Sequence, residues 1–217
     1  MWQRCALTGV ALLLCGAAQA NYRFDNPEQY LGDAAQWPSW SDVLRLNASD
    51  SALLADCVAN IESCPKRYHG VARLIVRARE LAFKDQLRLV NRYVNKRRYR
   101  RDRPYRSAEG EKLRNQWRPL LETLIRGGDC EDFATAKYFL LRELGVPADA
   151  MRVVVLWDTR TRDFHAMLAA DMGDGAWFLE TDNTIQRGPR LRKYRFQYSL
   201  NEKGIWDHSL TLQGSES

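Results

Sequence analysis

The chain has 217 residues, of which 45% are hydrophobic and 28% are charged, and its formal net charge is +6. This content is enough for the core of one globular domain, or of a small lobe beside a larger one, and it excludes a chain that is disordered throughout. After the first twenty residues no apolar run approaches the roughly 18 residues of a membrane-spanning helix, so the sequence excludes a further spanning segment.

Residues 1–20 have the pattern of a secretory signal peptide. Arg4 supplies the positive start, residues 6–16 are mostly apolar, and Ala18-Gln19-Ala20 is a small-x-small cleavage site. Leu14 in place of a small residue before Cys15 disfavours a lipoprotein signal. We therefore expect export to the periplasm, no membrane anchor after cleavage, and one mature domain over residues 21–217.

The first half of the mature chain is predicted to be helical. Residues 21–38 show little periodicity and are expected to be extended, whereas apolar residues recur at helical spacing in the segments that follow. The pattern predicts helices over residues 50–63, 71–95 and 111–125, and a helix from Cys130 to Leu144 that Gly145 and Pro147 end. Together these segments form an expected helical lobe over residues 40–145.

The second half changes to the pattern of strands. Short β-branched or alternating runs separated by turn residues predict strands at residues 152–157, 164–170, 176–180 and 194–198, with a last short strand at 205–206. This gives an antiparallel sheet lobe over residues 150–207. Helices followed by antiparallel strands indicate the α+β class.

Positive charge is concentrated between Arg92 and Arg106, where arginines alternate with tyrosines. Such a run is typical of nucleic-acid binding in intracellular proteins, but an exported protein seldom meets nucleic acid, so we expect no nucleic-acid partner. Two interpretations remain open, a solvated connector and a docking surface for an acidic partner.

Three cysteines remain once the signal peptide is removed, namely Cys57, Cys64 and Cys130. An odd number in an oxidising compartment implies one free or reactive thiol. Cys57 and Cys64 would lie about 10 Å apart on a continuous helix, too far for a disulfide, but Pro65 allows the helix to end before Cys64. The sequence leaves this pairing open.

Cys130 follows Gly127-Gly128-Asp129 at the predicted start of a helix. The free N–H groups and the dipole of a helix N-terminus favour a thiolate and can form an oxyanion hole. His165 lies in a predicted strand, and the next strand ends at Asp182, which antiparallel pairing can bring beside the imidazole. These positions predict a Cys130–His165–Asp182 catalytic triad, in which the cysteine is the nucleophile, the histidine the general base and the aspartate the orienting acid.

Acids surround this cysteine, because Asp129, Glu131 and Asp132 are its neighbours. Their negative charge opposes a thiolate, and a bound hard cation such as Ca²⁺ would cancel it. Asp149, in the loop after the helix, could add a ligand. The alternative is that acids at a helix N-terminus are favourable without any ion.

These motifs resemble the bacterial transglutaminase-like cysteine proteases of the periplasm. The resemblance rests on Gly128-Asp129-Cys130-Glu131-Asp132-Phe133-Ala134, on Phe164-His165-Ala166-Met167-Leu168 and on Thr181-Asp182-Asn183, and it covers roughly residues 40–198. It implies a papain-like, transglutaminase-type core with the cysteine at a helix N-terminus packed on the sheet, and the same triad.

The resemblance also implies a cofactor, a substrate and a partner. Activity would depend on calcium held by Asp129 and Glu131. The substrate would be a large surface adhesin, cut near its N-terminus so that a biofilm disperses. The partner would be the periplasmic domain of an inner-membrane cyclic di-GMP receptor that sequesters the protease.

Two other functions are compatible with the same residues. A transglutaminase-type acyltransferase uses the same triad but resolves the acyl-enzyme with an amine. A catalytically silent, calcium-dependent binding module would retain the fold and the acidic residues without turnover.

Overall fold

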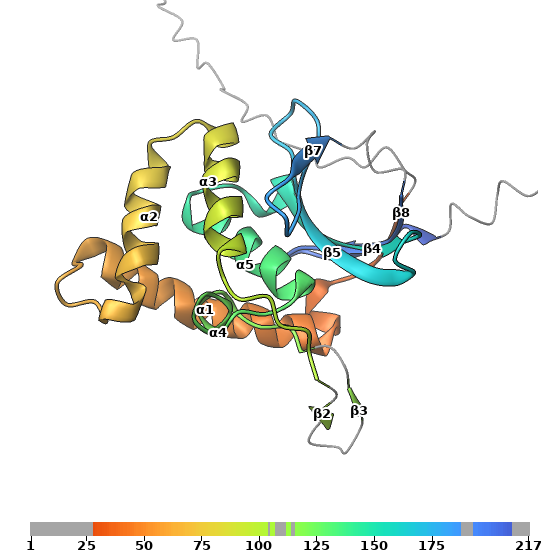
Figure 1. The fold of residues 1–217 in the computed structure, drawn as a ribbon, viewed down its shortest axis with the longest axis horizontal. Coiled ribbons are helices and arrows are strands. Elements are labelled where there is room, and N and C mark those ends of the chain that lie inside the picture. The colour runs from red at the N-terminus through yellow and green to blue at the C-terminus, as the bar shows by residue number, and fades with distance from the viewer. Residues whose placement is uncertain (1–27, 104, 107–111, 114–115, 188–192, 210–217) are drawn as a thin grey trace, which may run out of the picture.

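The computed structural model describes residues 28–103, 105–106, 112–113, 116–187 and 193–209. The expected signal peptide, residues 1–20, lies outside these described residues. The fold is α+β, with helices packed on an antiparallel sheet, as predicted (Figure 1).

The main sheet has seven strands in the order β1-β9-β8-β4-β5-β6-β7, and every neighbouring pair is antiparallel. The longest strands, β4, β5 and β8, lie together at its centre. The bounds are β1 Gln29–Gly32, β4 Met151–Asp158, β5 Asp163–Ala170, β6 Trp177–Leu179, β7 Ile185–Arg187, β8 Tyr194–Leu200 and β9 Ile205–Asp207.

Five α-helices lie beside this sheet in the described part of the chain (Figure 1). The helix that matters most is α5, Cys130–Glu143, which packs on β4 and β5 on one side and on α3 and α4 on the other. Its residues from Glu131 to Leu141 are all buried. The other helices are α1 Pro38–Ala59, α2 His69–Arg79, α3 Phe83–Asn95 and α4 Leu120–Arg126, with short 3₁₀ turns at Ala34–Gln36, Lys66–Tyr68 and Ala148–Ala150.

Alternate residues of β4 enter two separate apolar clusters. Val153 and Val155 belong to the main core beneath the helices, whereas Val154 and Leu156 pack on the opposite face with Phe178. Burial on both faces explains why this strand has the sequence of a continuous apolar run. Helix α5 packs on β4 and its partner β5 at the centre of the sheet.

The single long helix predicted over residues 71–95 is wrong, because the chain forms α2 and α3 with a turn between them. Leu81 N–H donates to the carbonyl of Ala78, and Ala82 is extended. The side chain of Gln86 also donates to the Ala78 carbonyl at 3.1 Å, which satisfies the end of α2. No glycine or proline marks this break in the sequence.

Two other predicted helices have different bounds. The helix predicted at 50–63 begins twelve residues earlier, at Pro38, where a proline suits the first helical position. The helix predicted at 111–125 is helical only from Leu120 onward among its described residues: Lys112–Leu113 forms β3, which pairs with β2 at Tyr105–Arg106, and α4 begins after Pro119. Strands β1 and β7 were not predicted from the sequence.

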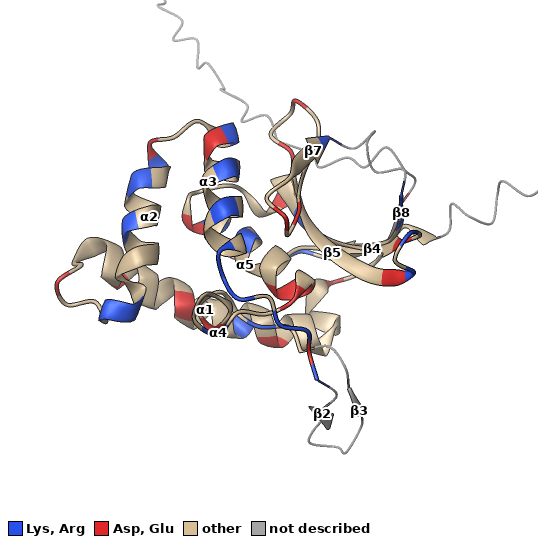
Figure 2. Cartoon of the chain, viewed as in Figure 1, with Lys and Arg blue, Asp and Glu red and all other residues tan. Residues whose placement is uncertain are grey.

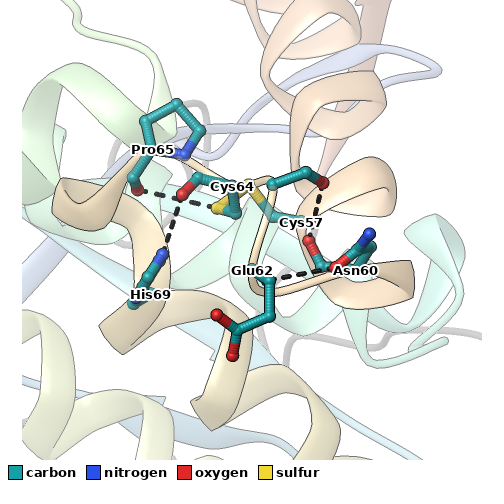
Figure 3. Close-up of a disulfide and its surroundings, with 7 residues drawn as sticks. Cys57, Asn60, Glu62, Cys64, Pro65 and His69 are labelled. Atoms are coloured by element: carbon teal, nitrogen blue, oxygen red, sulfur yellow. Dashed lines mark hydrogen bonds between the residues drawn. A yellow bond between two sulfur atoms is a disulfide. The ribbon is translucent and has the colours of Figure 1, made fainter.

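Cys57 and Cys64 form a disulfide, which settles the pairing that the sequence left open (Figure 3). Helix α1 ends at Ala59, and the following turn brings the two Cα atoms to 4.7 Å. His69 fixes the far side of this turn through a 2.8 Å hydrogen bond between its Nε2 and the Cys64 carbonyl. Cys130 is consequently the free cysteine of the described residues.

Lys and Arg residues, blue in Figure 2, recur along α2, α3 and the segment that follows α3. That segment is not a freely solvated connector, because residues 98–100 lie against the start of α5, where Tyr99 and Gly128 form a parallel bridge. Its arginine side chains at 98, 100 and 101 are nevertheless exposed. In the described part of the chain, no helix combines the length and apolar character needed to cross a membrane.

Candidate active site

The two glycines before Cys130 allow another segment to cross the start of α5. Gly127 has φ +76°, and a Cβ there would lie 2.0 Å from the carbonyl oxygen of Arg98. Gly128 donates its N–H to that carbonyl, and its own carbonyl accepts from the Arg100 N–H at 2.8 Å. The Gly-Gly pair therefore fastens residues 98–100 across the N-terminus of α5.

Cys130 is the first residue of α5, and its partly buried thiol opens into a cleft of about 1110 Å³. The same cleft is lined by His165, Glu180 and Asp182. The predicted nucleophile, base and acid thus come together at one cleft, from a helix, a strand and the segment after β6.

The thiol lies beside a carboxylate. Cys130 Sγ donates to Glu131 Oε2 at 3.2 Å. Burial raises the pKa of this thiol well above its ordinary value, and the negative charge of Glu131 raises it further, while a hydrogen bond from the Ala166 backbone lowers it. The net effect of this environment favours the thiol over the thiolate, as expected for a cysteine flanked by acids.

The side chain of His165, on β5, is held in place by Glu180 and Tyr194. Its Nε2 lies 2.7 Å from Glu180 Oε2, and the other carboxylate oxygen, Oε1, accepts from the Tyr194 hydroxyl at 2.7 Å. The Tyr194 ring also stacks on the imidazole, with an angle of 19° between the planes. Burial alone raises the pKa of Glu180, but the bonds from His165 and Tyr194 outweigh it and lower that pKa.

Asp182 makes a different contact. Its Oδ1 accepts from the Thr184 N–H at 2.9 Å, within the turn that joins β6 to β7, and the residue is exposed at the cleft. It is Glu180, and not Asp182, that accepts the hydrogen bond from the imidazole. The role predicted for Asp182 as orienting acid stays a prediction.

Three carboxylates gather beside the thiol. Asp102, Asp129 and Glu131 each place one oxygen within 4.8 Å of the others. Asp129 Oδ1 and Glu131 Oε1 are buried and accept no hydrogen bond from the residues that the structure describes. Burial and the neighbouring Asp129 raise the pKa of Glu131. Buried, unpaired carboxylate oxygens at this spacing fit a hard divalent cation such as Ca²⁺.

Arg118 connects one member of this cluster, Asp102, to the neighbouring Asp132. Its guanidinium pairs with Asp102 at 2.5 Å and with Asp132, and its backbone N–H donates to Asp132 Oδ1 at 2.8 Å. Asp132 in turn accepts from the Asp129 N–H, which completes a capping box at the start of α5. Burial raises the pKa of Asp132 to about 7, although Arg118 opposes that rise.

Not every acid suggested by the sequence belongs to the cluster. Asp149 pairs with Lys203 at 2.5 Å and is absent from the described group of cation ligands, whose third member is Asp102. Asp102 could have been noticed as the lone acid within the arginine-rich run. Glu180 could have been noticed because it is the carboxylate at the end of the predicted strand 176–180, two residues before Asp182.

Solved structures with a similar fold come from the LapG protein of Legionella pneumophila. The calcium-bound form is 28% identical over 65% of this chain and 78% of its own, with a TM-score of 0.57. A second LapG structure is 25% identical over 74% and 92% (TM-score 0.59), and an EGTA-treated one is 25% identical over 73% and 87% (TM-score 0.60). No match is found among curated proteins.

The sequence model of one protein family matches residues 50–207, which include every residue of the cleft discussed above. This match spans more than half of the chain and both lobes of the fold. The chain belongs to the bacterial transglutaminase-like cysteine proteinases.

Proposed function

We propose that this proteinase is a calcium-dependent endopeptidase, exported to the periplasm, that cleaves the N-terminal region of a large surface adhesin. Cleavage would release the adhesin and promote dispersal of a biofilm. The observation that carries the proposal is the shared cleft of Cys130 and His165 beside a carboxylate cluster. Membership of the proteinase family and the likeness to LapG support it.

In this proposal, Cys130 attacks the carbonyl carbon of the scissile peptide bond. His165 takes the thiol proton and returns it to the leaving amine, after which water hydrolyses the acyl-enzyme. The Cys130 N–H, at the first position of α5, is a candidate oxyanion-hole donor. A carboxylate from the segment after β6 holds the imidazole, and Asp182 is the residue that the family resemblance predicts for this role.

Asp102, Asp129 and Glu131 would hold the calcium ion. The buried oxygens without a hydrogen-bond donor support this assignment, as do the calcium-bound and EGTA-treated forms in which LapG has been solved. A bound Ca²⁺ supplies positive charge that offsets the carboxylates around the thiol. Asp102 brings the connector into this cluster, because its backbone N–H donates to Asp129 Oδ2 at 3.0 Å.

We also propose that a partner regulates the enzyme. The resemblance points to the periplasmic domain of an inner-membrane receptor for cyclic di-GMP, which would sequester the protease. Arg101 lines the cleft, and the exposed arginines at 98 and 100 precede it in the same segment, so the three supply charge for an acidic surface on such a partner.

The proposed function is tested with purified protein and an N-terminal fragment of a large adhesin from the same bacterium. We expect cleavage in calcium, none in EGTA, and none with Cys130→Ala, as judged by product mass. Fragments joined to an added amine donor would indicate an acyltransferase instead. Full cleavage by Cys130→Ala would refute the nucleophile assignment. A lack of cleavage, combined with a cell phenotype that depends on Asp129 but not on Cys130, would favour the binding module.

A further inference from the structure

We infer that Glu180 is a positioning residue that fixes the orientation and tautomer of His165. The inference rests on the proposed catalytic role of His165, and it concerns a carboxylate to which the sequence motifs assign no part. It starts from the 2.7 Å contact between Glu180 Oε2 and His165 Nε2.

An ionised carboxylate only accepts hydrogen bonds, so its partner nitrogen must carry the proton. Glu180 therefore selects the Nε2–H tautomer of His165. The lone pair of the neutral ring is then left on Nδ1, which is the nitrogen that can take a proton from a nucleophile. In the opposite tautomer Nδ1 carries the proton, so that nitrogen could not take one from a nucleophile.

The carboxylate of Glu180 is itself held in place. Tyr194 donates its hydroxyl to Oε1 and stacks its ring on the imidazole, so the two oxygens of Glu180 bind two different side chains. Only 7% of the Glu180 side chain is exposed. The ionised state persists in this setting because both hydrogen bonds stabilise it.

The main chain of Glu180 is fixed from the helical side. Its carbonyl accepts from Lys137 Nζ at 2.9 Å and from Asn95 Nδ2 at 2.8 Å, and its N–H donates to the Thr184 carbonyl at 2.9 Å. Lys137 is fully buried on α5, two turns after Cys130. Burial lowers its pKa to about 7, although Glu180 and Asp182 oppose that change.

These contacts connect the base to the helix that carries the nucleophile. Cys130 and Lys137 are both on α5, and Lys137 binds the residue that binds His165. Asp182 has no comparable restraint, since it is exposed and its contact is to the turn backbone. The arrangement is preorganised, so little rearrangement of Glu180 accompanies catalysis.

The test compares Glu180→Gln with Glu202→Gln in the calcium-loaded protein. Gln preserves the shape of Glu180 but can donate to Nε2, which permits the wrong tautomer. Glu202 is a matched control because, like Glu180, it accepts from a tyrosine hydroxyl, that of Tyr138. Its second partner is Arg142 instead of a histidine, and it does not line the cleft.

For Glu180→Gln we expect kcat on the adhesin fragment to fall at least about 100-fold with KM within about threefold, since loss of an orienting acid costs up to about 10,000-fold in a related triad. The ¹⁵N chemical shifts of the His165 ring should move toward the Nδ1–H tautomer. Glu202→Gln should change neither. Glu180→Asp keeps the negative charge, so its His165 ring should remain in the Nε2–H tautomer. Its kcat should be at least about tenfold higher than that of Glu180→Gln.

Glu180→Gln with kcat within threefold of the unmodified enzyme, or with the Nε2–H tautomer retained, would overturn the inference. The NMR measurement needs no substrate. If the unmodified protein cuts no adhesin fragment, the proposed function fails, while the ring spectrum still decides the role of Glu180. Asp158, Asp163, Asp182 and Lys193 also line the cleft and are the same in all variants, so a change in the ring reports position 180.

Discussion

Replacement of Arg118 by methionine tests how the acidic cluster is held. Arg118 is 18% exposed and pairs with Asp132, whose side chain is fully buried, and with Asp102, whose side chain is 5% exposed. Removing one partner of a buried pair leaves a charge without compensation and costs about 3–5 kcal/mol. We therefore expect Arg118→Met to lose at least about 3 kcal/mol of unfolding free energy at pH 8, or about 6–12 °C in Tm.

The loss should depend on pH in a defined direction. The pKa of Asp132 is already raised to about 7, and removal of Arg118 raises it further, so the carboxyl is protonated at pH 5 in both proteins. A protonated carboxyl needs no cation, and the loss at pH 5 should be less than half of that at pH 8.

Urea unfolding in EGTA at the two pH values measures both quantities without a contribution from calcium. Arg126→Met is the matched control, because Arg126 is 73% exposed and its pair with Glu122 lies at the surface, where such pairs contribute about 0–1 kcal/mol. A loss for Arg118→Met no larger than that of the control, or one that is equal at pH 5 and pH 8, would refute this reasoning.

Three further predictions concern the same region and the disulfide. A Cβ at Gly128 would lie 2.2 Å from Asp132 Oδ2, so Gly128→Ala should lower the unfolding free energy by about 2 kcal/mol or more in urea titrations. An unaffected protein would mean that the Asp132 side chain can move aside. Loss of the Cys57–Cys64 disulfide in the double alanine variant should lower the unfolding free energy by about 2–3 kcal/mol, because the unfolded chain gains loop entropy. Its kcat should be unchanged because neither cysteine lines the cleft, and an altered kcat would contradict this prediction. The raised pKa values of Glu131 and Asp132 mean that the folded protein binds more protons than the unfolded chain, so the stability of the metal-free protein should fall from pH 5 to pH 8. The increase in Tm on addition of calcium should be larger at pH 8 than at pH 5, as measured by thermal unfolding with and without EGTA. An increase that is the same at both pH values would argue against Glu131 as a ligand.

The sequence predicted α5 and its neighbouring strands because their signals are local. Apolar spacing, a glycine pair at the start and Gly145 at the end define the helix, and the β-branched run from Arg152 defines β4. The break between α2 and α3 has no such signal, since Leu81 and Ala82 continue the apolar pattern. It depends on Gln86 reaching back to the Ala78 carbonyl, which is a contact that only the folded chain reveals.

The same distinction applies to the cleft. Cys130 and His165 could be chosen because each lies in a recognisable local pattern, and the acids beside the cysteine suggested a cation. Asp102 is separated from Asp129 by 27 positions, and a crossing segment brings it to the cluster. Glu180 directly follows β6 and Asp182 lies in the turn to β7, only two positions later, so the sequence alone could not show which carboxylate reaches the imidazole.

Glu131 is the residue at which the proposed calcium site and the nucleophile meet. One of its oxygens accepts the hydrogen bond from the Cys130 thiol, and the other is buried without a hydrogen-bond donor among the described residues. A substitution at Glu131 would alter the thiol and the cation site together. Asp102 makes no such contact with the thiol, so Asp102→Asn is the change that can weaken the cation site while leaving the surroundings of Cys130 in place. A lower calcium affinity of Asp102→Asn would assign the ion to the carboxylate cluster, and an unchanged affinity would remove Asp102 from the ligands.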